Sequence, residues 1–494
     1  MTRRILLIAM IALLPQSITQ HAFSQTSTSS LSYSVADRGA VNVETAGGTD
    51  AMVVGYSRVQ PAASTTPAGV AIFGLRQNGT LVTEAGVPGM VTLVSGRTYA
   101  EVNGPINTGV AFSNPNNSPA VISFNFTDQA GNDFGQSSFV LEANAQSAKF
   151  LNEAPFNATP FAGTFTFSAS APVAVIALRT FVNQRSEFLV TTQSVTSIPD
   201  VVSASALVMG HFADGGGWNT QVILVNTTDT TISGTVQFYS EGSATVAGGP
   251  ITLTVNGQVG ASFNYSIRAR ASINFQTSGP AGVAAQVGSV RMTPSAGSAS
   301  PSAFTVFSFS SNGVTVSQAT VQAQPAGTAF RMYVEVNSRN GVAGAIQSGI
   351  AIANNSSTAA TVNFELTSTN GLNSGLAASA VVPPFGHVSK FVHELFPTLG
   401  LPFRGILRIS SSNSISVVSL RMRYNERSEF LITTTPATNE ASAATTEDLI
   451  FPHIVDRGGY TTQFILFNGV PGQAPVCTMR FYGQTGQALN VSIR

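Results

Sequence analysis

The stretch GVAFSNPNNSPAVISFNF, residues 109–126, returns later in the chain as GIAIANNSSTAATVNFEL, residues 349–366. Both copies run on to a shared ending, NQRSEFLVTT (183–192) in the first and NERSEFLITT (425–434) in the second. Repetition of a compact segment at domain length indicates an array of similar units, in which function belongs to the array as much as to single residues.

A weaker copy lies between these two, because TQVILVNTTDTTISGTVQFY begins at Thr220. Its opening recurs near the end of the sequence as TTQFILFN from Thr461. The array therefore contains about four repeats, and the sequence begins and ends partway through one.

Strand patterns dominate every copy. Segments such as ISFNFTD, TFTFSAS and TVQFYSE alternate or cluster Phe, Val, Ile and Thr between polar turns. Short helical turns are expected only around Leu151 to Pro155 and Val392 to Leu399. Seven or eight strands in about 110 residues are typical of an immunoglobulin-like or fibronectin-like sandwich. We predict an all-β chain of tandem antiparallel β-sandwiches.

Polar linkers rich in Ser, Thr and Pro divide the chain into these units. The segment from Tyr33, YSVADRGAVNVETAGG, aligns with the second half of a unit, YSIRARASINFQTSGP from Tyr265. The segment FPHIVDRGGYTTQFILFN, from Phe451, aligns with a first half. The predicted boundaries are complete sandwiches at 97–200, 205–322 and 329–437, a second half at 31–92, and a first half at 448–494.

Half a sandwich cannot bury its inner face and leaves strand edges unpaired. The two halves are complementary and together make about one unit. Four explanations stay open: closure of the chain into a ring, completion between molecules in a head-to-tail filament, a truncated sequence, or a shifted frame with four complete permuted units. Self-association is thus a candidate partner interaction.

The first 24 residues predict export. Arg3 and Arg4 precede an apolar run from Ile5 to Leu14, and small residues stand where cleavage would fall before Gln25. The run is too short to span a bilayer, and no later apolar span follows. We therefore expect a secreted, periplasmic or surface-attached protein with no membrane span after signal removal.

Charge and cysteine content exclude several classes. The 23 basic and 23 acidic residues cancel, so no basic surface is expected for nucleic acid. One cysteine, Cys477, rules out an internal disulfide framework, and we interpret it as a core residue. No catalytic, cofactor or metal motif stands out.

One pair of polar motifs recurs in HFADGGGW and HIVDRGGY, with His and Asp three residues apart. Such a pair could bind a metal or act in acid–base chemistry, but a third ligand or a nucleophile is missing. The glycines favour a turn, and an aromatic side chain beside glycines could also stack on a sugar ring. The candidate ligand contacts are His211, Asp214, Trp218, His453, Asp456 and Tyr460.

A second recurrent set is charged and lies on the hairpins that end the strong copies. It predicts either an exposed recognition patch or cross-strand ion pairs that keep a sheet edge soluble, and we favour the pairs. The residues are Arg179, Arg185 and Glu187 in the first copy and Arg421, Arg427 and Glu429 in the second.

The only two lysines also occupy equivalent positions, Lys149 in SAKFLNE and Lys390 in VSKFVHE, each four residues before a Glu. An internal Lys–Asn isopeptide bond, as in some adhesin domains, would require a buried lysine facing an Asn. We favour an ordinary Lys–Glu pair on a short helical turn.

The motifs VGYSRVQP and FGLRQNGTLVTEAGVP, which span Val54 to Pro88, resemble repeats of uncharacterised exported bacterial proteins built of tandem immunoglobulin-like sandwiches. The resemblance implies secretion and a sandwich fold, and implies no activity, cofactor or catalytic residue. The sequence thus favours a non-catalytic structural or adhesive protein of the cell surface, with a carbohydrate-binding protein that uses Trp218 and Tyr460 as the alternative and surface glycans as candidate partners.

Overall fold

The computed structural model describes residues 26–193, 195–198, 203–280 and 282–494, so the predicted export signal lies outside the described residues. The all-β prediction is confirmed, because 62% of the chain is strand and 1% is helix. Within the described ranges the single α-helix is α1 (Val392–Leu395), where a helical turn was expected. The other expected helical turn, at Leu151–Pro155, is a series of bends and turns.

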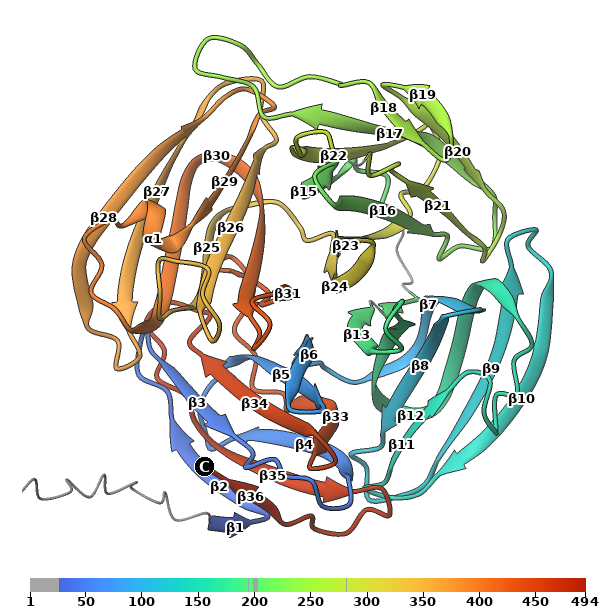
Figure 1. The fold of residues 1–494 in the computed structure, drawn as a ribbon. Helices are drawn as coiled ribbons and strands as arrows, with labels where there is room; N and C mark the ends of the chain where they lie inside the picture. The colour runs from blue at the N-terminus through green and yellow to red at the C-terminus, as the bar shows by residue number, and fades with distance from the viewer. Residues whose placement is uncertain (1–25, 194, 199–202, 281) are drawn as a thin grey trace, which may run out of the picture.

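The sheets are arranged in a ring (Figure 1). We describe four units around it: a first, a second and a third in chain order, and a composite unit made from both ends of the described chain. The first unit contains β7 (Leu93–Asn103), β8 (Ile106–Ser113), β9 (Ala120–Asp128), β10 (Asp133–Leu141), β11 (Gln146–Phe150), β12 (Phe161–Val182), β13 (Phe188–Gln193) and β14 (Thr196–Ser197). The third contains β25 (Gly327–Val336), β26 (Ile346–Asn354), β27 (Ala360–Ser368), β28 (Asn373–Val382), β29 (His387–Phe391), β30 (Phe403–Tyr424), β31 (Phe430–Thr434) and β32 (Thr438–Asn439).

The first and third units share one design, an eight-stranded half-barrel built around a 22-residue strand, β12 or β30. The first part of β12 pairs with β7 and β9, and its last part pairs with β8 and β13. The register shifts between Ser168 and Val173, where the strand contains Pro172 and passes from one face of the unit to the other. A single long strand thus replaces two strands joined by a turn.

The second and composite units each consist of two four-stranded sheets and one two-stranded sheet instead. The second unit contains β15 (Leu207–Asp214), β16 (Trp218–Val225), β17 (Ile232–Ser240), β18 (Leu253–Val255), β19 (Gln258–Gly260), β20 (Phe263–Ile267), β21 (Ser272–Gln276), β22 (Gln286–Pro294), β23 (Ser302–Ser311) and β24 (Val314–Gln322). The composite unit contains β1 (Thr26–Thr28), β2 (Ser30–Ser34), β3 (Ala40–Glu44), β4 (Val53–Pro61), β5 (Ala68–Gln77), β6 (Thr80–Pro88), β33 (Leu449–Asp456), β34 (Tyr460–Phe467), β35 (Val476–Gly483) and β36 (Val491–Ile493). The two-stranded sheet is β18-β19 in the second unit and β1-β36 in the composite unit.

Strands from the two ends of the chain interleave within the composite unit. Its sheets have the orders β3-β34-β5-β6 and β2-β35-β4-β33, which match β21-β16-β23-β24 and β20-β17-β22-β15 of the second unit. Inside β34, Leu466 faces Val41 of β3 on one side and Gly69 of β5 on the other. The composite unit is therefore a circular permutation of the second, and its completion within one chain closes the ring.

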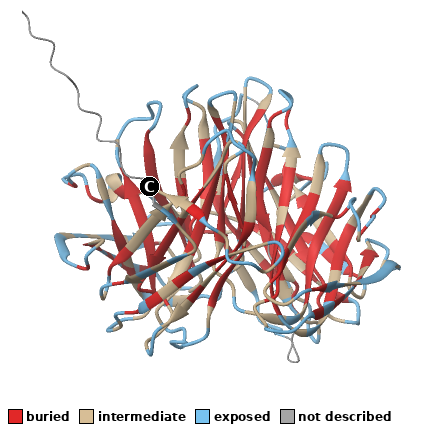
Figure 2. Ribbon diagram, turned by 90° about the horizontal axis from the view of Figure 1, so that it is seen from below, coloured by how far each residue is buried: buried red, intermediate tan, exposed pale blue. Residues whose placement is uncertain are grey.

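One hydrophobic core holds the composite unit together across this junction. Phe464 is fully buried and packs edge-on against Phe451 at 5.4 Å between ring centroids, and Phe481 lies 5.7 Å away. These side chains share a core with Val59 and Phe73 from the N-terminal strands. Figure 2 shows that buried positions run along the strands of the whole ring, whereas the connecting loops are exposed. Burial of aromatic surface from both chain ends is the main force that joins them.

The innermost strands β6, β13, β24 and β31 meet at the centre of the ring (Figure 1). Hydroxyl groups join neighbouring units here: Val190 N donates to Thr83 Oγ1 at 3.2 Å, and Ile432 N donates to Ser317 Oγ at 2.8 Å. A third such bond runs from Thr320 N to Thr191 Oγ1 at 2.8 Å. Side chains of Ser and Thr thus satisfy backbone groups that have no strand partner at the centre.

Candidate functional site

Two equivalent clefts lie between units, one between the composite and first units and one between the second and third. Their volumes are about 470 and 350 Å³. We call them the twin clefts. The composite–first cleft is lined by His453, Tyr460, Lys149, Glu153 and Phe188, and the second–third cleft by the equivalent His211, Trp218, Lys390, Glu394 and Phe430. Ring closure therefore gathers polar motifs that are far apart in the sequence.

A glycine-rich turn positions the aromatic side chain of each cleft, Trp218 in one and Tyr460 in the other. Gly215, Gly216 and Gly217 all have positive φ angles, and a bridge joins Gly215 to Trp218, the first residue of β16. A Cβ atom on Gly217 would collide with the backbone oxygen of Ser310, so the turn requires glycine there. The sequence RGGY forms the same turn before Tyr460.

Trp218 is half-buried within an aromatic cluster. Its ring lies 4.7 Å from that of Phe309 and meets the ring of Phe430 edge-on at 6.1 Å. Tyr460 is also half-buried, and burial raises the pKa of its hydroxyl. Each cleft thus contains a half-buried Trp or Tyr ring beside phenylalanine rings, and part of the surface of that ring stays open to contact with a ligand.

The histidines point to neighbouring units rather than to their sequence-adjacent aspartates. His211 Nδ1 lies 3.1 Å from His387 Nε2, and the other ring nitrogen of His387 lies 3.5 Å from Glu241 Oε1. In the other cleft, His453 Nδ1 lies 3.3 Å from the amide nitrogen of Gln146, the equivalent of His387. Burial lowers the pKa of His453 to about 4, and burial together with the neighbouring His387 lowers that of His211 to about 3. Both histidines are therefore neutral at pH 7.

Asp214 and Asp456 stabilise neighbouring loops by accepting backbone hydrogen bonds. Asp214 Oδ1 accepts a hydrogen bond from Gly279 N at 2.7 Å, and Asp456 Oδ1 accepts one from Gly47 N at 3.0 Å. Both side chains are buried, and within the described ranges neither forms a hydrogen bond to the histidine three residues earlier. Across the described ranges, no group of three or more His, Cys, Asp or Glu side chains is placed to hold a metal ion.

The two lysines are exposed, which is incompatible with the buried lysine that an isopeptide bond needs. The expected Lys–Glu pairs are also not formed. Instead Glu153 Oε2 accepts a hydrogen bond from Phe150 N at 2.9 Å, and Glu394 Oε2 accepts one from Phe391 N at 2.7 Å. Neither lysine belongs to an ion pair among the described residues, so each presents an unpaired cation at a cleft.

Four members of the charged set meet at the centre of the ring. Arg185 binds Glu187 at 2.8 Å and Glu429 at 2.6 Å, and Arg427 binds the same two carboxylates at 2.8 Å from Glu429 and 2.7 Å from Glu187. We call this group the charge quartet. Although burial opposes ionisation, hydrogen bonds from Asn and Arg side chains lower the pKa of both glutamates. All four residues lie in the loops that join the strands, so the pairs are not the cross-strand pairs expected from the sequence. Two of the four contacts stay within one unit, whereas Arg185–Glu429 and Arg427–Glu187 bridge the first and third units.

The remaining two arginines are buried and cannot belong to an exposed patch. Arg179 is 4% exposed and binds Glu101 at 2.9 Å. Arg421 is 2% exposed, contacts Glu84 and lies 3.6 Å from Glu335. These arginines sit on the long strands β12 and β30, where they neutralise glutamates at the packed interior of the ring.

Comparisons with known proteins give no family. No family model matches the chain, and no curated protein matches it. Among solved structures, a structure of infectious bursal disease virus, Gx strain, is 8% identical, with 78% of this chain and 80% of that chain covered and a TM-score of 0.12. The VP2 subviral particle of the same virus is 9% identical, with 80% and 84% covered and a TM-score of 0.11. Likenesses this weak carry no argument about function.

Proposed function

We propose that this chain is an exported, non-catalytic structural or adhesive protein of the cell surface or extracellular space, and that the twin clefts make its ligand contacts. The single observation that carries the proposal is the recurrence of one set of side chains in two clefts on different sides of one ring. Two equivalent weak sites on one ring suit a polymeric or surface-bound ligand, because the second contact is then intramolecular.

The state of the polar groups supports binding over catalysis. Asp214, Asp456, Glu153 and Glu394 all accept backbone hydrogen bonds, and the cleft histidines are neutral with strongly lowered pKa values. A general acid or base needs a free group with a pKa near the working pH. What each cleft offers a ligand is an aromatic face and an unpaired ammonium group.

Carbohydrate is the ligand class that the aromatic faces favour. A sugar ring can stack on Trp218 or Tyr460 while its hydroxyls meet the polar side chains around the cleft. We further infer that the repeat is immunoglobulin-like, which is supported by the two packed four-stranded sheets and common core of the second unit.

The test first measures binding of the protein to a glycan array. Each glycan that the protein binds on the array is then tested as a soluble oligosaccharide. Trp218→Ala or Tyr460→Ala alone should lower retention on the polyvalent array by about 100-fold or more, because bivalent attachment is lost. The same variants should only halve the stoichiometry for a soluble oligosaccharide. Trp218→Phe and Tyr460→Phe keep an aromatic ring and serve as matched controls.

Trp218 is the only tryptophan of the chain, so its fluorescence reports the second–third cleft directly. If the variant with both Trp218→Ala and Tyr460→Ala bound the glycan array as tightly as the wild type, the twin clefts would not be the ligand-binding sites. If the protein mediated cell adhesion but bound no glycan, carbohydrate would be excluded as its ligand and the adhesive function would be retained.

A further inference from the structure

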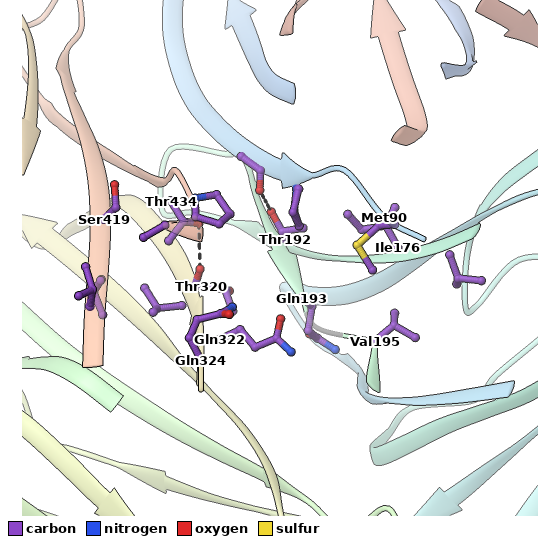
Figure 3. A pocket seen from close by; sticks show the side chains of 18 residues that line it. Met90, Ile176, Thr192, Gln193, Val195, Thr320, Gln322, Gln324, Ser419 and Thr434 are labelled. Carbon is purple, nitrogen blue, oxygen red and sulfur yellow. Dashed lines mark hydrogen bonds between the residues drawn. The ribbon is translucent and has the colours of Figure 1, made fainter. Parts of the chain in front are cut away.

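A separate cavity of about 200 Å³ lies on the axis of the ring, where all four units contribute to its wall (Figure 3). Gly86 comes from the composite unit, Thr192 from the first, Thr320 from the second and Thr434 from the third. The charge quartet precedes β13 and β31, whereas this cavity adjoins the ends of the same strands. We call it the axial cavity.

The wall of the axial cavity is largely apolar, and the described residues that form it include no charged side chain. Its apolar lining includes Met90, Ile176, Val195, Val417 and Val418. The threonine hydroxyls are already engaged, since Thr434 Oγ1 donates to Thr320 O at 3.0 Å and Thr192 Oγ1 donates to Gly86 O. A charged molecule would lose its hydration here without finding a counter-ion, so the cavity selects against ions.

One side chain on this wall, that of Gln193, carries a buried polar atom that has no partner. Gln193 is 2% exposed, and its Nε2 donates to Tyr99 O and, at 3.1 Å, to Thr98 Oγ1. These bonds fix which end of the amide is nitrogen, because a flipped amide would place oxygen against the carbonyl of Tyr99. Gln193 Oε1 has no hydrogen-bond partner among the described residues. A buried acceptor without a donor is costly, so a donor brought by a ligand is strongly favoured.

We propose that the axial cavity binds one small, uncharged, mainly apolar molecule whose N–H or O–H group donates to Gln193 Oε1. Its size fits about one ring, since a cavity of roughly 150 Å³ is known to hold benzene. This site is independent of the twin clefts, because the two share no aromatic or lysine residue.

The test compares phenol with toluene, two probes of nearly equal shape of which only phenol carries a donor. We expect phenol to bind the full chain at least about 10-fold more tightly, measured by titration calorimetry, because a site built around a hydrogen bond rejects the analogue that lacks it. Gln193→Met should reduce this preference to about 3-fold or less. The exposed rim variant Gln322→Met is the matched control and should keep the wild-type preference.

Gln193→Met also removes the bonds to Tyr99 and Thr98 and could fail to fold. A second variant, Ala437→Phe, therefore fills the cavity from a half-buried position with Gln193 intact, and should abolish phenol binding. Absence of phenol binding to the wild type, with water alone at Gln193, overturns the proposal. So does phenol binding that survives Ala437→Phe, or that disappears in the Trp218→Ala/Tyr460→Ala variant, which would assign it to the twin clefts.

Discussion

Replacing the two cleft histidines should make the protein more resistant to mild acid. The perturbation is the double variant His211→Gln/His453→Gln, and glutamine is chosen because Gln146 already occupies the place of His387 in the composite–first cleft. Both histidines have native pKa values far below the ordinary value of 6.5, about 3 for His211 and about 4 for His453. The unfolded chain therefore binds protons between pH 6.5 and pH 4 that the folded chain does not.

This difference fixes the sign and the size of the effect. Stability falls as pH falls wherever the unfolded state binds more protons, with about 1.4 kcal/mol per pH unit for each such group. From pH 6.5 to pH 5 each histidine should cost about 2 kcal/mol, or about 4 kcal/mol for the pair. The charge-quartet glutamates, whose pKa values are lowered, contribute stability that is lost only below their ordinary pKa of 4.5. The window from pH 7 to pH 5 thus excludes the quartet glutamates, and comparison with the double variant separates the two cleft histidines from His393, whose pKa is also lowered by burial.

The assay is equilibrium unfolding in urea at pH 7 and pH 5, followed by far-ultraviolet circular dichroism. The wild type should lose about 4 kcal/mol between the two pH values, and the double variant less than about 1 kcal/mol. Each single variant should lie midway, because the histidines belong to different clefts. Equal losses in wild type and double variant would refute the placement of neutral, half-buried histidines between units.

The remaining predictions concern the core, the turn before Trp218 and the charge quartet. Phe464→Ala should destabilise the folded chain by about 3–5 kcal/mol, because it empties the core that joins the two chain ends; an unfolding midpoint in urea like that of the wild type would contradict this. Gly217→Ala should cost more than about 1 kcal/mol and shift Trp218 emission, since the position combines positive φ with a backbone collision; an unchanged spectrum and midpoint would argue against the turn geometry. Glu187→Gln should cost about 1 kcal/mol at low salt and less at 1 M salt, and a loss that is independent of salt would show that the quartet contributes no Coulombic stabilisation.

The all-β class and the repeat could be read from the sequence because both depend on local patterns. Alternating apolar residues give strands, and the alignment of Tyr33 with Tyr265 places the N-terminal segment in the second half of a unit. The fusion of two strands into β12 was not foreseen, because Pro172 reads as a strand end. In the folded chain it lies at a register shift within a strand that continues past it.

The candidate sites depended on contacts between units, which no local pattern contains. His453 and Lys149 recur separately in the sequence, and only ring closure places them in one cleft. Sequence reasoning paired His211 with Asp214, its neighbour in the chain, whereas its actual neighbour is His387 from another unit. Gln193 gave no signal at all, since its importance comes from burial and from one unpartnered oxygen. Residues of this kind can be recognised only in the folded structure, where four units meet around one axis.

Completion of the composite unit within one chain is the central claim, and one substitution tests it. Tyr33 in β2 lies directly opposite Cys477 in β35, at a cross-strand spacing that suits a disulfide. Burial raises the pKa of Cys477 to about 11 despite the nearby Tyr33 hydroxyl. The wild-type thiol should therefore react little with the oxidant and give a low background signal. The neighbouring Ser34→Cys, which faces Val476, is the matched control.

The measurement is the state of the thiols in Tyr33→Cys after oxidation of the native, dilute protein with oxidised glutathione. Ring closure predicts an intramolecular disulfide between positions 33 and 477 in a monomer, found by peptide mass mapping, and none in Ser34→Cys. Disulfide-linked ladders that grow with protein concentration would contradict closure within the chain.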